Sequence, residues 1–346
     1  MSRTGNSAVS TQESMRAAVY YKYGSPDNIS VIDIEKPAPK DGEVLIRVKA
    51  ASVNAYDWHL LRAKPFFTRF LSGVFKPANN ILGADVSGVV VSAGPGASRF
   101  KPGDKVYGCL ESCGKGGLAA GGFAEYVCAK ESVLAPAPIG LSFEEAAALP
   151  MAAVTALQGI RDMGQIKRGM KVLINGASGG VGSFAVQIAK AYGAEVTAVC
   201  STGSMDLARS LGADRVIDYK KENFAEEGEK YDVILDIAAS RSVKDYRRAL
   251  KTGGVCVVIG FSTIGHMISV LLAGKRDGKG NIGILTANNK IGGDLLELNK
   301  LIEAGKLKAV IDSQYPLEAV SDAIRRVETG HPKGKVIISS QLPMHE

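Results

Sequence analysis

The sequence predicts an α/β protein of two domains, a β-rich outer domain and a doubly wound parallel-sheet domain inserted into it. The chain has 346 residues, more than one compact core usually organises. Short β-patterned runs with Gly and Pro turns fill its first third, whereas strand and helix patterns alternate in its middle. We therefore divide the chain into a tail (1–14), the outer domain (15–140), the parallel-sheet domain (141–285) and a return to the outer domain (286–346).

The outer domain is predicted to be a compact barrel or sandwich. Turn signals such as Pro37-Ala-Pro39 and Gly94-Pro-Gly96 separate its β-patterned runs. Because these runs are short and irregularly spaced, they favour a closed β-structure over parallel βα units. The runs are 16–21, 29–34, 43–52, 86–92, 105–108 and 124–127.

The pattern changes near Leu141. Ser142 followed by Glu145 makes a capping box, which opens an alanine-rich helix to about Leu149. The alternation that follows is typical of a parallel sheet with helices on both faces. It comprises strands at 171–175, 195–200, 216–219, 233–238 and 255–259, and helices at 180–192 and 205–211. After a helix over 294–303, two strand-like runs at 309–312 and 335–339 are expected to return to the outer domain.

Composition excludes several classes of protein. With 46% hydrophobic and 22% charged residues, the chain is neither disordered nor fibrous, and its longest apolar runs are too short to span a membrane. The net charge of +7 comes from Lys and Arg spread along the chain, so we expect a solvated basic surface and no nucleic-acid site. Five scattered cysteines fit a reducing cytosol, and hence a cytoplasmic protein.

The strongest chemical signal is the glycine-rich stretch from Asn175 to Gly182, where an apolar strand turns directly into a helix. Glycines let the backbone approach a diphosphate, and the N–H groups and dipole at the start of the helix attract the anion. Ala177 replaces the first glycine of the usual G-x-G-x-x-G, although Gly176 lies beside it. We interpret the stretch as a dinucleotide site; a glycine turn without a ligand is the alternative.

The choice between NADPH and NADH is made at the end of the next strand, where an acidic residue would bind the ribose hydroxyl of NADH. Residues 200–204 are Cys-Ser-Thr-Gly-Ser, without a carboxylate. Small hydroxyls can donate to a 2′-phosphate, and no acid is there to repel it. NADPH is therefore favoured, and NADH stays possible because no Lys or Arg occupies this segment.

Further sequence blocks occur in order along the chain. They are Ala51-Ser-Val-Asn-Ala-Tyr-Asp-Trp58, Gly83-Ala-Asp-Val-Ser-Gly88, Phe100-Lys-Pro-Gly-Asp-Lys-Val106, Gly122-Phe-Ala-Glu-Tyr126, Ala148-Leu-Pro-Met-Ala-Ala-Val-Thr-Ala-Leu157, Leu211-Gly-Ala-Asp214, Val310-Ile-Asp312 and Gly334-Lys-Val336. With the glycine turn, they make the chain resemble the medium-chain dehydrogenase/reductases, in the zinc-independent quinone oxidoreductase and enone reductase branch. The resemblance implies a GroES-like barrel for the outer segments, a Rossmann domain in the middle, an active site between them and a homodimer through the Rossmann sheets.

The resemblance also bears on metal. Zinc-dependent members have Cys where this chain has Asn54, His where it has Ala84, and another Cys near Met151 to Val154, where this chain has none. Three ligands of a catalytic zinc site are thus missing, and the cysteines at 109 and 113 lack the four-ligand spacing of a structural site. We therefore expect no metal.

Site residues follow from the motif and from the resemblance. The glycine turn and the strand end after it predict cofactor contacts at Ser178, Gly179, Gly180, Val181, Ser201 and Thr202. The resemblance adds Thr155, Gly260 and Phe261 beside the nicotinamide, Tyr219 at the adenosine end, and Asn288 in a cofactor-contacting stretch. Simple packing is the alternative for Thr155 and Tyr219.

The activity that the resemblance implies is conjugate reduction, with hydride passing from NADPH to the β-carbon of an enone, enal or quinone. Asn54 is predicted to donate a hydrogen bond to the developing oxyanion, although a loop Asn that caps local backbone is the alternative. His59, Tyr56 or water would return the proton.

Two other functions stay open: an alcohol or aldehyde dehydrogenase of the same superfamily, and a catalytically silent NADPH-binding protein. The sequence does not indicate which carbonyl compound is the substrate. The loops expected to line the cleft, 62–80 and 262–282, show no readable pattern.

Overall fold

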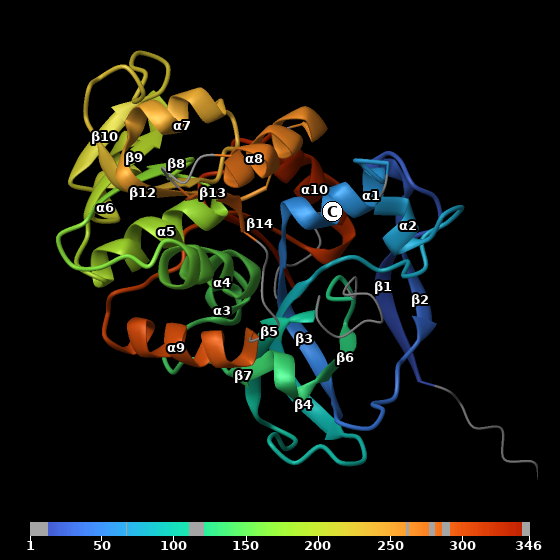
Figure 1. Ribbon diagram of the computed structural model, residues 1–346. Coiled ribbons are helices and arrows are strands. Elements are labelled where there is room, and N and C mark those ends of the chain that lie inside the picture. The colour runs from blue at the N-terminus through green and yellow to red at the C-terminus, as the bar shows by residue number, and fades with distance from the viewer. Residues whose placement is uncertain are drawn as a thin grey trace, which may run out of the picture.

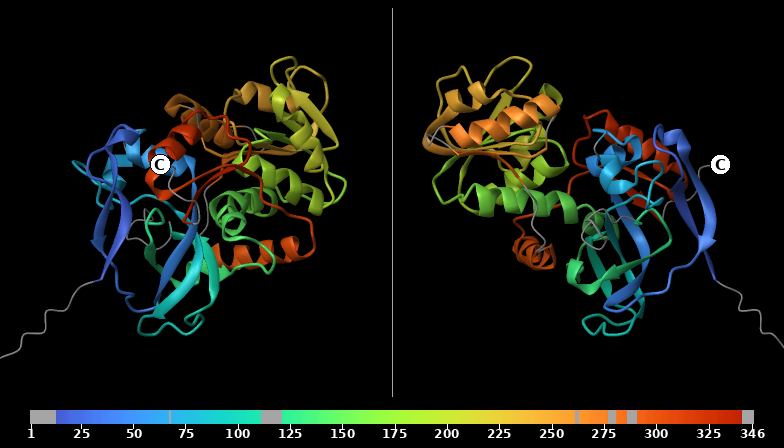
Figure 2. Two further views of the ribbon diagram at one scale, coloured as in Figure 1. Left: turned by 180° about the vertical axis from the view of Figure 1, so that it is seen from behind. Right: turned by 45° about the vertical axis from the view of Figure 1, so that its right-hand side comes forward.

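The computed structural model describes residues 13–66, 68–110, 121–260, 263–276, 281–285 and 291–340. These residues form two units that lie side by side, one around a six-stranded sheet and one around a seven-stranded sheet (Figures 1 and 2). Within these ranges, no helix has the length and apolar character needed to cross a membrane.

The six-stranded sheet is parallel throughout, with its strands in the order β10, β9, β8, β11, β12, β13. This is the doubly wound sheet that the sequence predicts. The strand bounds are β8 Lys171–Asn175, β9 Glu195–Cys200, β10 Arg215–Asp218, β11 Tyr231–Asp236, β12 Leu250–Val258 and β13 Asn281–Ile284.

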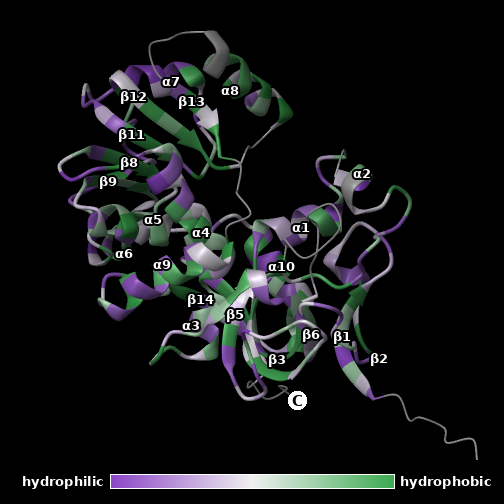
Figure 3. Ribbon diagram, turned by 60° about the horizontal axis from the view of Figure 1, so that its bottom comes forward, coloured by the Kyte–Doolittle hydropathy of each residue, from purple (hydrophilic) through white to green (hydrophobic). Residues whose placement is uncertain are grey.

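Helices cover both faces of this sheet (Figure 1). One face carries α4 (Pro150–Gln158), α5 (Gly180–Ala191) and α6 (Met205–Ser210), and the other carries α7 (Val243–Ala249) and α8 (Ile264–Arg276). Helix α9 (Ile291–Glu303) packs against α4 and against the outer domain. In β8, Val172 and Ile174 pack toward α5, whereas Leu173 packs toward the opposite face. The central strands are therefore largely apolar, as Figure 3 shows, because helices cover both of their faces.

The seven-stranded sheet forms the outer domain, in the order β14, β15, β3, β4, β5, β7, with β6 also paired to β3. Its last two strands come from the end of the chain: β15 runs antiparallel to β3, and β14 runs parallel to β15. The strands are β3 Glu43–Val53, β4 Asp85–Ala93, β5 Lys105–Cys109, β6 Tyr126–Lys130, β7 Leu134–Pro136, β14 Ile311–Tyr315 and β15 Lys335–Ser339. A mostly antiparallel β domain beside a doubly wound parallel sheet is the two-domain combination that the sequence predicts.

Smaller elements complete the outer domain. A hairpin of β1 (Ser14–Tyr20) and β2 (Ile29–Glu35) packs beside the sheet, with α1 (Ala55–Arg62), α2 (Thr68–Ser72), α3 (Phe143–Ala147) and α10 (Val320–Glu328) around it. At α3 the predicted capping box is present: the Ser142 hydroxyl accepts from the Glu145 N–H, and the Glu145 carboxylate accepts from the Ser142 N–H.

Two stretches interpreted as loops without pattern contain helices. The 62–80 stretch includes α2, and the 262–282 stretch includes α8. In α8, Val270 and Ala273 are buried against the sheet, whereas the apolar residues Ile264, Ile268, Leu271 and Leu272 are exposed. Because apolar side chains occupy both sides of this helix, its sequence lacks the one-sided periodicity by which an amphipathic helix is detected.

Candidate cofactor and active site

A cavity of about 700 Å³ lies at the carboxyl ends of the parallel strands. It is lined by the ends of β8 and β9, by the residues after β11 and by residues 330–333 of the outer domain. The sheet order reverses between β8 and β11, because β9 lies on one side of β8 and β11 on the other. Open α/β sheets bind ligands at such a point.

The glycine turn forms one wall of this cavity. Gly176 has a φ of +88°, which favours glycine, and a Cβ on Gly182 would collide with the carbonyl oxygen of Gly176. Helix α5 begins after Gly179, which supplies no side-chain cap. The amino end of this 12-residue helix can therefore hold an anion through its N–H groups and dipole. These donors fit the diphosphate of a dinucleotide.

Two cations border the same cavity, and neither was found from the sequence. Lys333 donates from Nζ to the carbonyl oxygen of Gly203 over 2.7 Å, which brings its ammonium from the outer domain to the end of β9. Arg241 follows β11, and its guanidinium lies over the Phe224 ring at 5.4 Å. Both cations come from loops that are distant in the sequence from residues 200–204, so the local pattern at the end of β9 does not predict them.

The end of β9 carries hydroxyl groups and also lies beside a carboxylate. Ser201 lines the cavity, with its hydroxyl 3.4 Å from that of Ser204. Thr202 instead donates to Asp218 over 2.5 Å. Asp218 ends the neighbouring strand β10 in register with Cys200, and the Thr202 hydrogen bond is the main cause that lowers the pKa of its carboxyl. An acid is therefore present near the site, bound by the hydroxyl of Thr202.

The other predicted cofactor residues fall in several places. Ser178, Gly179, Ser201 and Tyr219 line the cavity together, while Gly180 and Val181 form the first turn of α5. Thr155 is half-buried on α4, and Gly260 follows β12 with a φ of +84°. Phe261 and Asn288 lie outside the described residues. Contact of these residues with a cofactor stays a prediction.

Asn54 belongs to a buried polar network. Its Nδ2 donates to Asp85 Oδ2 over 2.9 Å and to the Ser52 carbonyl oxygen over 3.3 Å, and its Oδ1 accepts from Lys335 Nζ. Asp85 also accepts from the Ser52 hydroxyl over 2.8 Å and from the Met151 N–H over 2.9 Å. In this arrangement both amide hydrogens of Asn54 are engaged within the protein. Its role as a donor to substrate oxygen therefore stays a prediction.

A second carboxylate is buried beside this network. Asp57, on α1, accepts from the N–H groups of Asn54 and Gly83 over 2.7 and 2.8 Å. Burial raises its pKa to about 7, although the two backbone hydrogen bonds act in the opposite direction. Lys335 lies close enough to favour its charged form. The hydrogen bonds of Asp57 and the nearby charge of Lys335 thus together hold the backbone at Asn54 in place.

The two candidate proton donors lie on α1. His59 is half-buried and stacks on Trp58 with a centroid distance of 3.7 Å, and its Nδ1 lies 2.7 Å from the Lys64 carbonyl oxygen. Burial lowers its pKa, which disfavours the protonated form that a general acid at neutral pH requires. Tyr56 packs against the apolar clusters of both units, at the contact between them. Neither assignment is tested.

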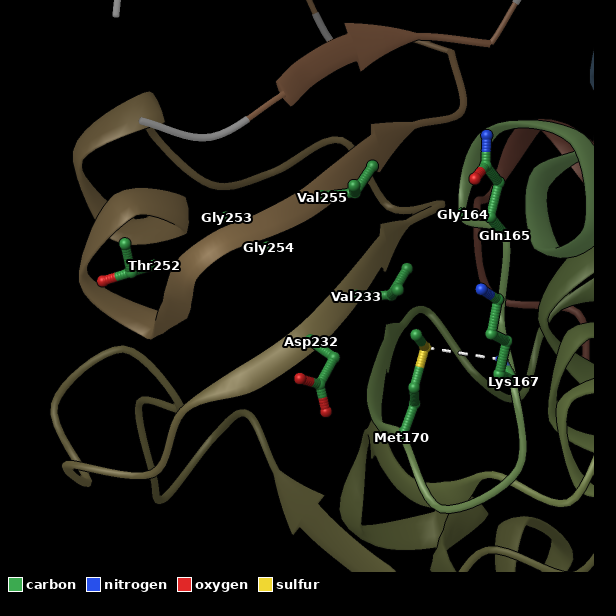
Figure 4. A pocket seen from close by; sticks show the side chains of 10 residues that line it. All are labelled: Gly164, Gln165, Lys167, Met170, Asp232, Val233, Thr252, Gly253, Gly254 and Val255. Carbon is green, nitrogen blue, oxygen red and sulfur yellow. Dashed lines mark hydrogen bonds between the residues drawn. The ribbon is translucent and has the colours of Figure 1, made fainter. Parts of the chain in front are cut away.

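A different hollow lies at the amino ends of the strands (Figure 4). It measures about 210 Å³. The Asp232 carboxylate on its wall already accepts from the Lys171 N–H and from Lys251 Nζ. Because dinucleotides bind at the carboxyl ends of such sheets, this hollow is a poorer candidate than the cavity at the glycine turn.

Known proteins match this chain over both units. The family described as "Alcohol dehydrogenase GroES-like domain" matches residues 40–139, and that described as "Zinc-binding dehydrogenase" matches residues 211–338. The 2-methylene-furan-3-one reductase of Solanum lycopersicum is 37% identical over 345 residues, which cover 96% of this chain and 81% of that protein. The chloroplastic NADPH-dependent alkenal/one oxidoreductase of Arabidopsis thaliana is 36% identical over 337 residues, which cover 95% and 80%.

A solved structure agrees with these relatives. The quinone oxidoreductase from Coxiella burnetii superposes with a TM-score of 0.83 at 29% identity, and the match covers 95% of this chain and all of that one. Because the match covers nearly the whole of both chains, the likeness includes both sheets.

The zinc-binding description of one matched family does not fit the residues present. Nowhere in the described part of the chain do three His, Cys, Asp or Glu side chains gather as a metal site. Asn54 contacts the Asp57 and Asp85 carboxylates and the Lys335 ammonium, and an ammonium donates hydrogen bonds but cannot ligate a cation. No chemistry at this site is therefore assigned to zinc.

Proposed function

From the premise that the chain belongs to the medium-chain dehydrogenase/reductase superfamily, in its quinone and enone oxidoreductase branch, we propose that it reduces quinones or α,β-unsaturated carbonyl compounds with NADPH. The observation that carries the choice of cofactor is the pair of cations, Arg241 and Lys333, at the cavity of the glycine turn. Relatives with substrates of this kind in their names support the choice of substrate class.

Two groups of cavity residues would hold NADPH, one at its diphosphate and one at its 2′-phosphate. The N–H groups of the first turn of α5, at Gly180 and Val181, would bind the diphosphate. Ser201, Arg241 and Lys333 would bind the 2′-phosphate by charge-assisted hydrogen bonds, which NADH cannot form. When bound, NADPH supplies the hydride.

The rest of the chain would orient the substrate and supply a proton. Asn54 and its network lie in the outer domain, and Gly334 connects that domain to the glycine turn by donating its N–H to the Ser178 carbonyl oxygen over 3.0 Å. Because burial lowers the pKa of His59 and so disfavours its charged form, Tyr56 or water is the better source of the proton.

The cofactor choice is tested by removing the two cations singly. We expect Lys333→Ala and Arg241→Ala each to lower kcat/KM for NADPH by roughly 10- to 100-fold, the value of a lost hydrogen bond to a charged group, and to leave kcat/KM for NADH nearly unchanged. Lys167→Ala, at the hollow of Figure 4, is the matched control. Steady-state assays with a quinone, an enone and an alkenal supply the rates.

Two outcomes would contradict the proposal. Equal losses with both cofactors would mean that the cations do not select a 2′-phosphate. Tight NADPH binding without turnover of any of the three substrates would favour the silent binding protein.

Location and assembly belong to the same proposal. Cys109, Cys128, Cys200 and Cys256 are free thiols, in keeping with a reducing, cytoplasmic setting, although relatives carry chloroplastic or mitochondrial names. Strand β13 is one of the two edges of the six-stranded sheet and would carry the homodimer contact. Size-exclusion chromatography with light scattering tests the dimer.

A further inference from the structure

A positive charge is buried beside Asn54. Lys335 is the first residue of β15, and its side chain is only 4% exposed. Its ammonium lies 3.6 Å from Asp85 Oδ2, and it donates to Asn54 Oδ1. Fully buried lysines are rare, because an ammonium loses its hydration and must recover that loss from partners. Packing alone therefore does not explain why a lysine occupies position 335.

The ammonium determines how the Asn54 amide is oriented. An ammonium only donates, so the amide must present its oxygen to Lys335. Its nitrogen then points to Asp85 Oδ2, over 2.9 Å. Asp85 is in turn held by the Ser52 hydroxyl and the Met151 N–H. Each group in this network fixes its neighbour, and Lys335 contributes the positive charge.

The same lysine adjoins the glycine turn. A Cβ built on Gly180 would lie 3.0 Å from Lys335 Cδ, so the lysine stem passes against the first turn of α5. The preceding residue, Gly334, pairs with the turn as an isolated parallel bridge to Gly179. Lys335 thus joins the wall of the cofactor cavity to Asn54, although the two come from different units of the fold.

We propose that Lys335 is a positioning residue of the reaction, whose buried ammonium, paired with Asp85, orients Asn54 and acts as the fixed cation that a metal supplies in zinc-binding members of the superfamily. The inference rests on the proposed function. A fixed positive charge in a site of low dielectric stabilises negative charge that develops on a substrate oxygen. It needs no reorganisation, because the fold holds it in place.

The charges facing Lys335 set its pH dependence. Burial lowers its pKa, while Asp85 on β4, Asp57 on α1 and Cys109 on β5 act to raise it. The net direction is downward, so the ammonium is lost at lower pH than an exposed lysine would lose it. Activity that depends on this charge should fall on the alkaline side of the pH profile.

Three variants test the proposal against the wild type. Lys335→Met removes the charge, Lys335→Arg keeps it, and the double variant Asp85→Asn with Lys335→Met removes both members of the pair. Lys251→Met, which removes an exposed ion pair with Asp232, is the matched control. The readouts are kcat and KM for NADPH and substrate, the pH profile of kcat, and thermal unfolding without cofactor.

We expect Lys335→Met to unfold at a lower temperature than the wild type, because Asp85 is left buried without its partner. The double variant should recover the unfolding temperature and still show kcat reduced by about 100-fold, the scale of a misplaced catalytic geometry, with little change in KM for NADPH. Lys335→Arg should retain part of kcat and shift the alkaline limb to higher pH, because Arg stays protonated.

Several results would overturn the proposal. The first is a folded Lys335→Met or double variant with the kcat of the wild type. The second is an alkaline limb that does not move in Lys335→Arg. The third is stoichiometric zinc in the purified protein whose removal abolishes activity. A wild type that reduces no quinone or enone would instead refute the proposed function, and this inference with it.

Discussion

The adenosine end of the cavity and the network around Asn54 use charge in opposite ways. At the adenosine end, Arg241 and Lys333 reach the cavity from two units of the fold, and Tyr219 is 42% exposed. Around Asn54 the charges of Asp85 and Lys335 are buried and bonded to each other. The cations at the cavity can exchange bound water for a ligand, whereas the buried Asp85–Lys335 pair cannot. We call the first arrangement open and the second closed. The first region is suited to binding, and the second to holding a geometry.

The largest expected effect comes from breaking the closed pair. Asp85→Ala leaves the Lys335 ammonium buried without its carboxylate, which should lower the free energy of unfolding by about 3–5 kcal/mol. Chemical denaturation measures the change. Glu229→Ala is the control, because its ion pair with Lys171 is partly exposed, and exposed ion pairs contribute little to stability. If both variants lost a similar free energy of unfolding, buried and exposed ion pairs would contribute equally and the distinction between the two regions would fail.

Next in size is the close packing of the glycine turn. Gly182→Ala places a Cβ against the carbonyl of Gly176, and overpacking of this kind should lower the free energy of unfolding by about 1–3 kcal/mol. Gly179→Ala is the informative partner, because the one heavy atom near its Cβ is 3.6 Å away and its φ is −78°.

Gly179→Ala should therefore fold normally and bind NADPH more weakly, because the added methyl group stands where the backbone must approach the diphosphate. Thermal unfolding and fluorescence titration with NADPH separate the two effects. Normal NADPH binding by Gly179→Ala would show that the diphosphate does not rest at this turn.

The third effect is a pH dependence of stability that comes from Asp57. Burial raises the pKa of its carboxyl from 3.8 to about 7, so the folded state binds this proton more tightly than the unfolded chain does. The resulting stabilisation is complete below pH 3.8 and is lost as the pH rises through 7. In Asp57→Asn, thermal unfolding should vary less with pH over this range than in the wild type. Parallel curves for the two proteins would contradict the assignment.

The features that the sequence predicts are those whose interacting residues lie close together along the chain. The parallel sheet and the glycine turn were predictable, because strand, turn and helix follow one another in the chain. The cations Arg241 and Lys333 were not, because folding brings them to the end of β9 from other loops. Asp85 and Lys335 stand in two of the blocks that carry the family resemblance. Nothing local indicates that Lys335 meets Asn54, 281 residues away.

The smallest expected effect concerns Asp218, the carboxylate beside the end of β9. Asp218 precedes Tyr219 at the cavity, and its Oδ2 accepts from Thr202 over 2.5 Å. Thr202→Val removes this donor and leaves the charge less screened from a 2′-phosphate. We expect KM for NADPH to rise about two- to fivefold, because an ion–ion repulsion at the edge of the cavity is weak, and KM for NADH to stay the same. Thr202→Ser keeps the hydroxyl and should match the wild type. If Thr202→Val raised KM for both cofactors equally, Thr202 would act through the shape of the loop, and Asp218 would have no part in the choice of cofactor.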